Sequence, residues 1–311
     1  MKEMILLFQE LLVLYGIGVI GFVCKKINLF QPSADIVFSN LLLYVTLPCL
    51  ILFSMDIPFT STILSEFYWL ILLSSGALCL ASILAYLLAT KCSLSSNRNG
   101  VFQSLIIFGN QGFIGYGICY ILFGEKGILY AAFFNFPYLL LIWSYGIYLI
   151  SKSAGSINWK ELFLNPGIIS TCVGSLIFIV PGGWPIPLLN MFKMVGEITI
   201  PLSMLFIGCL LANLKIKEIG SLLKNKYLWI SSVCKCLINP LLLFPLLFTT
   251  IPSGLVLVAI LITATPSAPT TSIYAQRYGG DRYFASTGVL ISTLLASICI
   301  PVLYGLGMLL L

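Results

Sequence analysis

Two short polar stretches, far apart in an apolar sequence, have the residue types of a binding site inside a membrane. Each combines helix-breaking residues with amide or hydroxyl side chains: Asn110, Gln111 and Gly112 in the first, and Thr265, Pro266, Ser267, Pro269 and Thr270 in the second. Proline removes a backbone donor and clashes with the preceding turn, and glycine weakens a helix interior. Broken helices occur in hydrocarbon only inside protein or beside a wet cavity. The two stretches therefore predict two interrupted helices that share a site.

The chemistry that such a site favours is the binding of a small anion. A half-helix that begins within the membrane presents unpaired amide donors and the positive end of its dipole. These groups suit an anion without requiring a buried lysine. Pro266 and Pro269 fit the first turn of such a helix, with Thr265 or Ser267 as its N-cap. The alternative is that the small residues of both stretches only permit close helix packing.

The elements that carry these stretches are membrane-spanning helices. The chain has 311 residues, of which 59% are hydrophobic and 8% are charged, and its mean hydropathy is +1.07. Apolar runs of roughly 20 residues, the length that crosses a bilayer, predict an all-α polytopic membrane protein with ten transmembrane helices. We expect the spans at residues 4–24, 36–56, 66–90, 100–123, 127–150, 162–180, 188–212, 227–249, 254–276 and 283–311.

Basic residues set the predicted orientation of these spans. Of the 16 lysines and arginines, 12 fall in the odd-numbered connections and three in the N-terminus and the even-numbered connections. Basic residues favour the cytoplasmic side, so both termini are expected outside the cytoplasm, in a plasma (inner) membrane. The connections also account for the net charge of +6. We therefore expect the lipid bilayer, and no nucleic acid, as a partner.

The sequence also contains an internal repeat. Thr46-Leu47-Pro48 and Thr199-Ile200-Pro201 are separated by 153 residues, and the same offset relates Asn110 to Thr263, at the head of the second polar stretch. An odd number of spans in each half places the halves in opposite orientations. We therefore predict two inverted five-helix repeats, at residues 1–151 and 162–311, joined by a cytoplasmic linker at residues 152–161. The interruptions fall in spans 4 and 9.

Several motifs, spread over the whole chain, resemble those of a transporter family. They are Thr46-Leu47-Pro48, the run from Gly109 to Gly115, the segment from Thr199 to Gly208, and Pro266-Ser267-Ala268 followed by Tyr278-Gly279-Gly280-Asp281 and Ala285-Ser286. In combination they resemble the auxin efflux carrier family of the bile/arsenite/riboflavin transporter-like superfamily, which comprises permeases of organic anions.

The resemblance implies a secondary transporter that binds a small organic anion, such as a carboxylate, where the two broken helices cross. It implies elevator-type alternating access, in which spans 1, 2, 6 and 7 form a scaffold and spans 3–5 and 8–10 move. No cofactor is implied, and related members are often dimers, so a homodimer is expected among its partners. This chain departs from the family pattern at Gly117, in place of proline, and at Pro269-Thr270-Thr271, in place of asparagine. Because of these departures, the resemblance does not identify the substrate.

Three ionisable residues are candidates for positions inside the membrane, where charge is costly and often functional. Lys235 is a substrate-binding candidate, and its alternative role is to snorkel to the cytoplasmic surface. Glu197 and Glu10 are candidates for coupling transport to a second ion. For Glu197 the alternative is an interfacial pair with Lys193, one helical turn earlier. Glu10 is expected near the membrane interface.

Other function classes fit the sequence less well. A cation/proton antiporter-like carrier shares the inverted repeat but usually needs aspartates at the crossing, whereas Asp35, Asp56 and Asp281 fall at span ends. An enzyme would need a nucleophile with a base, or a metal; the chain has no histidine, and we expect neither catalysis nor a metal site. The ten cysteines are interpreted as small buried hydrophobes, not as a disulfide or zinc framework. A ligand sensor built on a transporter fold also fits the sequence and remains an alternative function.

Overall fold

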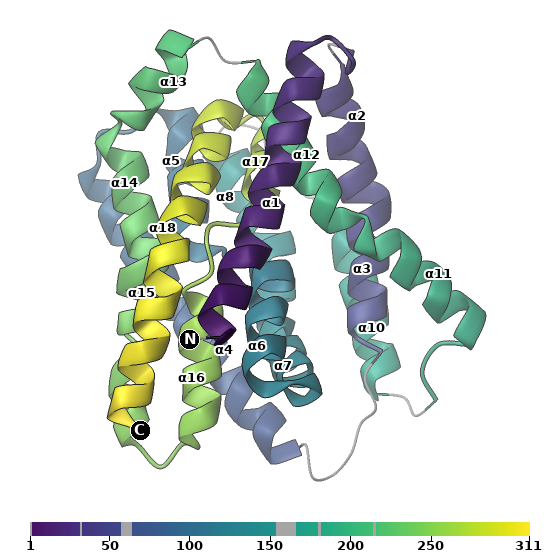
Figure 1. The fold of residues 1–311 in the computed structure, drawn as a ribbon, viewed down its shortest axis with the longest axis vertical. Helices are drawn as coiled ribbons and strands as arrows, with labels where there is room; N and C mark the ends of the chain where they lie inside the picture. Colours follow the sequence, from purple (N-terminus) through teal and green to yellow (C-terminus); the bar gives the residue numbers. More distant parts are fainter. Residues whose placement is uncertain (1, 32, 57–63, 154–165, 180–181, 214–215) are drawn as a thin grey trace.

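The computed structural model describes residues 2–31, 33–56, 64–153, 166–179, 182–213 and 216–311 as a helical protein (Figure 1). These ranges contain no strand, and their one isolated β-bridge joins Gly109 to Ser267. The all-α part of the fold prediction is confirmed. From residue 154 onward, the predicted linker at 152–161 lies outside the described ranges.

One set of helices packs around α1, and we call it the α1/α12 group. α1 packs along α12, and α3 packs against α10 and α11. Its members are α1 (Lys2–Lys26), α2 (Ala34–Leu41), the π-helical turn η1 (Leu42–Thr46), α3 (Leu47–Ser54), α10 (Pro166–Ile179), α11 (Ile186–Glu197) and α12 (Thr199–Ala212).

A second set of helices forms what we call the bundle. In it α4 packs against α5 and α7, α5 against α8 and α14, and α18 against α14 and α17. The first half of the chain supplies α4 (Leu64–Lys91), α5 (Ser96–Ile107), η3 (Gln111–Gly115), α6 (Tyr116–Phe123), α7 (Glu125–Leu141), η4 (Ile142–Gly146) and α8 (Ile147–Ser153). The second half supplies α14 (Lys226–Val233), η5 (Cys234–Ile238), α15 (Asn239–Leu241), η6 (Phe244–Phe248), α16 (Ser253–Thr263), α17 (Pro269–Tyr278) and α18 (Arg282–Leu310). A short helix, α13 (Ile216–Leu223), precedes α14.

Six helical segments of the described chain are long and apolar enough to cross a membrane: residues 34–54, 65–91, 130–152, 186–209, 226–248 and 282–310. The other four predicted spans lie in α1, in α10 and in the two interrupted helices. α10 has 14 residues, and interruption leaves 12 residues in α5 and 11 in α16. A break therefore explains why two of the four predicted spans are not single long helices.

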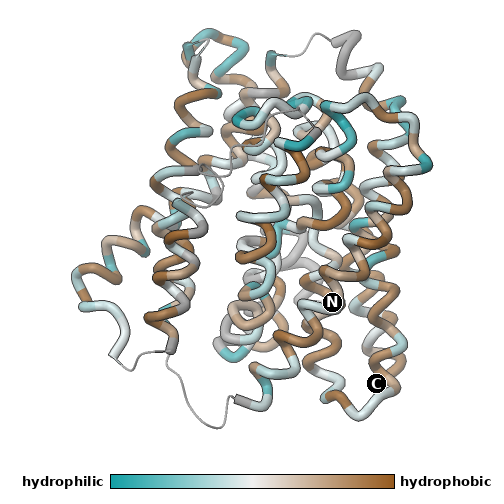
Figure 2. Tube along the Cα trace, turned by 180° about the vertical axis from the view of Figure 1, so that it is seen from behind, coloured by the Kyte–Doolittle hydropathy of each residue, from teal (hydrophilic) through white to brown (hydrophobic). Residues whose placement is uncertain are grey.

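Hydrophilic residues gather at one end of the molecule, and apolar residues cover the helices between the ends (Figure 2). α1 runs toward this end and α18 runs away from it (Figure 1). Lys25 and Lys26 end α1, and Arg282 begins α18. Large apolar side chains stay exposed along the same helices, for example Val19 and Ile298. An apolar belt with a basic rim is the surface of a helical protein in a bilayer.

α1 and α12 approach each other backbone to backbone. A Cβ atom added at Gly208 would clash with the Gly18 carbonyl oxygen and would lie 2.8 Å from the Phe22 amide nitrogen. A Cβ atom at Gly21 would likewise clash with the backbone of Leu205. Small residues permit such close contact between transmembrane helices. Glycine residues therefore allow α1 and α12 to pack closely against each other.

The two polar stretches interrupt helices of the bundle. After α5 the backbone is extended at Phe108 (φ −94°, ψ 120°) before η3 begins. After α16 it is extended at Ala268 (φ −67°, ψ 134°), and Pro269 is the first residue of α17. Proline suits this position because its amide would have no helical partner and its fixed φ is helical. Both interruptions thus lie at the helix-breaking residues of the sequence.

Candidate functional site at the crossing of two interrupted helices

The two interruptions pair with each other in an antiparallel bridge. The Asn110 amide donates to the Pro266 carbonyl oxygen at 2.6 Å, and the Ala268 amide donates to the Phe108 carbonyl oxygen at 2.9 Å. We call residues 108–110 and 264–268 the crossing. Because the bridge uses these two amides, they are not open to a ligand.

Gly109 allows the closest approach within the crossing. A Cβ atom at this position would lie 2.6 Å from Thr265 Oγ1, 2.7 Å from Lys235 Nζ and 2.8 Å from Lys235 Cε. These separations are shorter than van der Waals contact, so a larger residue would have to displace both side chains. Three residues from three different predicted spans therefore meet at one point.

Side chains also satisfy the carbonyl end of α5. Asn239 Nδ2 donates to the Ile106 carbonyl oxygen at 2.9 Å, and Ser267 Oγ donates to the Leu105 carbonyl oxygen at 2.7 Å. The last carbonyls of a helix have no intrahelical partner, and inside a membrane no bulk water replaces one. The second interruption and its neighbour α15 thus complete the hydrogen bonding of the first.

Lys235 satisfies a carbonyl group at the C-terminal end of α16, as Asn239 and Ser267 do at the end of α5. Its Nζ donates to the Thr263 carbonyl oxygen at 2.9 Å, and the residue is 1% exposed. It lies in η5, a π-helical turn of the kind that often occurs at functional sites. An ammonium at the C-terminal end of a helix meets the negative end of its dipole. The alternative that Lys235 snorkels to the bilayer surface is therefore wrong.

Several buried side-chain oxygen atoms have no hydrogen-bond partner within the described part of the chain, and three of them adjoin the crossing or the helix end beside it. They belong to Gln111 (Oε1), Asn239 (Oδ1) and Thr263 (Oγ1). Buried polar atoms are seldom left without a partner, so water or a ligand is expected there. Gly112, beside Gln111, faces open space, since an added Cβ would meet no atom within 4 Å.

Two predicted residues have roles other than the expected ones. Thr265 and Ser267 are expected as N-caps of the second half-helix, but Thr265 Oγ1 donates to the Ile262 carbonyl oxygen at 2.7 Å and Ser267 Oγ bonds to α5. The N-cap of α17 is Ala268, which has no capping side chain. Because Pro269 is the first helical residue, the N-cap falls one position after Ser267. Both hydroxyls are therefore free to satisfy carbonyl groups.

The predicted coupling residues belong to the α1/α12 group and not to the crossing. Glu197 ends α11, and its carboxylate, 58% exposed, lies 4.0 Å from Lys193 Nζ. This is the geometry of the i, i+4 pair considered as its alternative role, and such an exposed pair contributes little to stability. Glu10 lies in α1, and its side chain is outside the described part of the structure.

Three residues of the site are missed by sequence analysis. Tyr138, in α7, donates its hydroxyl to the Gly109 carbonyl oxygen at 2.7 Å. Ser292, in α18, accepts a bond from an amide of the second interruption at 3.0 Å. Asn239 is the third, and its position four residues after Lys235, on the same helix face, is a signal that could have identified it. The other two lie in long helices that contain several polar residues, and nothing in the sequence distinguishes them from the rest.

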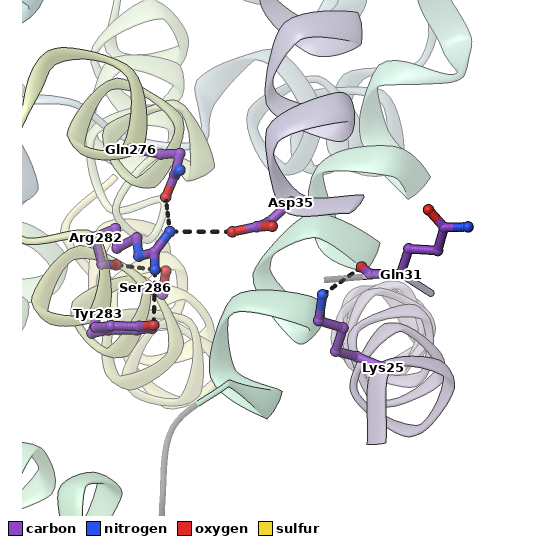
Figure 3. Close-up of polar contacts among 7 residues, drawn as sticks. All are labelled: Lys25, Gln31, Asp35, Gln276, Arg282, Tyr283 and Ser286. Atoms are coloured by element: carbon purple, nitrogen blue, oxygen red, sulfur yellow. Dashed lines mark hydrogen bonds and ion pairs between the residues drawn. The ribbon is translucent and has the colours of Figure 1, made fainter. Parts of the chain in front are cut away.

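The α1/α12 group and the bundle are joined by a polar contact at the hydrophilic end of the molecule (Figure 3). Arg282 Nη1, at the start of α18, lies 3.2 Å from Asp35 Oδ2 of α2 and donates to Gln276 Oε1 at 2.7 Å. Arg282 Nη2 donates to the Tyr283 hydroxyl at 3.0 Å. Among the four ion pairs of the described residues, only Asp35–Arg282 connects the group to the bundle.

At the opposite end, aromatic rings fill the contact between the group and the bundle. The Phe178 ring of α10 stacks on Phe67 of α4, with 5.4 Å between centroids, and meets Phe133 of α7 edge-on at 5.8 Å. Aromatic contacts of this kind add to the stabilisation from burial. The two units thus contact each other through a polar pair and through apolar rings, and α1 and α12 also pack against α6, α17 and α18 of the bundle.

Known proteins with similar sequences agree with a role in transport. The chain matches the family described as "Membrane transport protein" over residues 6–161 and 154–304. It is 24% identical over 285 residues to an uncharacterized transporter of Methanocaldococcus jannaschii, a match that covers 88% of this chain and 90% of the relative. It is 23% identical over 288 residues to an uncharacterized transporter of Methanothermobacter thermautotrophicus, with 91% and 92% covered. Because the family match extends over nearly all of the sequence, the chain belongs to the membrane transport protein family, the auxin efflux carriers that its motifs resemble.

Proposed function

We propose that the protein is a permease that moves a small organic anion, such as a carboxylate, across the plasma (inner) membrane, with the substrate bound at the crossing. In this proposal its ten transmembrane helices form two inverted five-helix repeats, at residues 1–151 and 162–311. The observation that carries the proposal is the pairing of two interrupted helices around a buried ammonium and buried oxygens without partners. Threonine hydroxyls and amides can donate as well as accept, so this lining can bind an anion.

Charge at the crossing supports an anion over a cation. Within the described residues, the Lys235 ammonium bonds to a carbonyl oxygen, and no carboxylate forms an ion pair with it. A buried charge without a counter-charge is costly, and a bound anion reduces that cost. A cation/proton antiporter-like carrier would instead need carboxylates at this position. The alternative carrier class is therefore less well supported than the anion permease.

Elevator-type movement is the proposed mechanism. Among the described residues, the side chains that bond to the crossing or to the helix ends beside it, including Tyr138, Lys235, Asn239 and Ser292, come from the bundle. The site is thus tied to one unit. Under this proposal the bundle moves with the substrate and the α1/α12 group, corresponding to spans 1, 2, 6 and 7, stays in place as the scaffold.

Removing polar groups from the crossing should reduce transport more than it reduces stability. We expect Asn110→Ala and Thr265→Val each to lower transport by about tenfold or more, while loss of the Thr265–Ile262 bond costs about 1 kcal/mol of stability. Thr265→Ser, which keeps the hydroxyl, is the matched control and should transport nearly normally. The measurement is uptake of labelled carboxylates into proteoliposomes under an imposed potential. Normal transport by both variants would contradict the proposed site, and specific binding without transport would indicate a sensor.

The proposed orientation places both termini outside the cytoplasm. In a cysteine-free background, a cysteine at Ser253, the first residue of α16, should react with an impermeant thiol reagent added outside intact cells. A cysteine at Lys217, in α13, should react only after the membrane is opened, because α13 follows an odd-numbered span on the basic side. Labelling of both positions from the same side would contradict the ten-span topology.

A further inference from the structure

Two arginines of the bundle contact the α1/α12 group at the hydrophilic end of the molecule. Arg282 contacts the Asp35 carboxylate of α2 at 3.2 Å (Figure 3). Arg277, in the last turn of α17, donates from Nη2 to the Tyr44 hydroxyl of η1 at 2.9 Å. Its guanidinium also lies over the Tyr44 ring, 5.6 Å from the ring centroid. The helical segment formed by α2 and η1 is therefore held at two positions by side chains of the bundle.

The Asp35 carboxylate depends on the bundle for its counter-charge. Its side chain is 5% exposed, whereas that of Arg282 is 34% exposed. Among the described residues, Arg282 is the only ion-pair partner of Asp35. Gln276 and Tyr283 accept further bonds from the same guanidinium and so fix its direction. A buried carboxylate that loses its cation is costly, so this pair favours the arrangement in which α2 and the start of α18 lie together.

α17 connects these contacts to the crossing. It begins at Pro269, directly after Ala268, whose amide bonds to the first interruption, and its last turn carries Gln276 and Arg277. α17 is a single helix of ten residues, which is roughly 15 Å long. A crossing that moves relative to α2 therefore displaces Arg277 from Tyr44 and the support of Arg282 from Asp35.

We propose that the Asp35–Arg282 pair, supported by the Tyr44–Arg277 contact, is a latch. The latch holds the bundle against the α1/α12 group in the arrangement of Figure 1 and opens in every transport cycle. The inference rests on the proposed function, because only a bundle that moves has to release such a contact. It gives Asp35 a part in the movement of the bundle and none in binding the anion. Its test requires no substrate.

The test measures how often the two units meet at a different contact, where the Phe67 and Phe178 rings stack with 5.4 Å between centroids. Cysteines at these two positions, in the full-length cysteine-free protein in liposomes, should be bridged by a short bifunctional thiol reagent while the latch is closed. The initial cross-linking rate should fall about fivefold or more in Asp35→Asn and in Asp35→Asn/Arg282→Gln. The double replacement removes both charges, so it should also recover the melting temperature that Arg282→Gln alone loses.

Arg98→Gln is the matched control. Arg98 Nε lies 2.7 Å from Asp281 Oδ2, and this ion pair joins the start of α5 to the N-cap of α18, inside the bundle. Its loss should lower the melting temperature and leave the cross-linking rate unchanged, because no contact between the two units is removed.

Three results would overturn the inference. They are equal cross-linking rates in all folded variants, a fall in Arg98→Gln as large as that in Asp35→Asn, and no cross-linking while the latch residues are intact. If Asp35→Asn is not recovered folded, the double variant decides. Failure of the wild type to transport any anion would contradict the proposed function while leaving these cross-linking rates unaffected, so the two failures are distinguishable.

Discussion

Replacing Gly109 by alanine should abolish transport. The added Cβ atom would lie 2.6 Å from Thr265 Oγ1 and 2.7 Å from Lys235 Nζ. Both side chains are buried and bonded to the end of α16, so relief requires them to move and to weaken those bonds. Overpacking of this kind costs about 1–3 kcal/mol, and it would displace two groups of the proposed site. We expect transport near background in proteoliposomes and a lower melting temperature in detergent.

Gly117→Ala is the control for this prediction. Gly117 lies in α6, eight residues further along the same polar stretch, and an added Cβ would meet no atom within 4 Å. Alanine is also the better helix former, by about 1 kcal/mol. Gly117→Ala should therefore transport normally and melt at or above the wild-type temperature. Equal activity of the two alanine variants would show that the close approach at Gly109 is not needed.

Replacing Gly208 by valine should prevent the α1/α12 group from assembling. Even the first carbon of the new side chain would clash with the Gly18 carbonyl oxygen. The obstacle is helix backbone and not the end of a flexible side chain, so the helices must move apart and lose their contact along α1. We expect little monodisperse protein after purification, and a large drop in the melting temperature of any that is recovered.

Gly16→Val, on α1 itself, is the matched control for Gly208→Val. A Cβ atom at Gly16 would meet nothing within 4 Å, so this variant introduces the same side chain where there is space for it. It should be purified in normal yield and melt close to the wild type. A Gly208→Val variant with wild-type yield and melting temperature would disprove the tight contact between α1 and α12.

The positions of the helix interruptions could be read from the sequence because local chemistry causes them. Proline destabilises the interior of a helix. Pro269 instead begins α17, a position that proline favours because its missing amide would have no helical partner there. The glycines and amides after Phe108 act similarly in the first interruption. The all-helical architecture follows from apolar runs for the same reason: a span in hydrocarbon must satisfy its own backbone.

The partners at the crossing could not be predicted, because they depend on how separate helices are rotated and packed. The rise per residue places Lys235 at a depth in the membrane but says nothing about which neighbour it faces. In the structure it faces Thr263, 28 positions away in sequence. Likewise, the N-cap prediction for Thr265 or Ser267 is wrong, because the Thr265 hydroxyl bonds to the preceding turn of α16 and the Ser267 hydroxyl bonds to α5. These hydrogen-bond partners are set by tertiary packing, about which a single sequence carries little information.

The buried ammonium of Lys235 has an electrical consequence for a bundle that moves. If the bundle moves as proposed and Lys235 is protonated, the empty bundle carries one more positive charge than the bundle loaded with a monovalent anion. The membrane voltage would then act more strongly on the return of the empty bundle than on the loaded step. A negative cytoplasm would favour that inward return by about 2.3 kcal/mol per 100 mV for a full crossing. Under this proposal the voltage speeds the return step that follows the release of an anion outside.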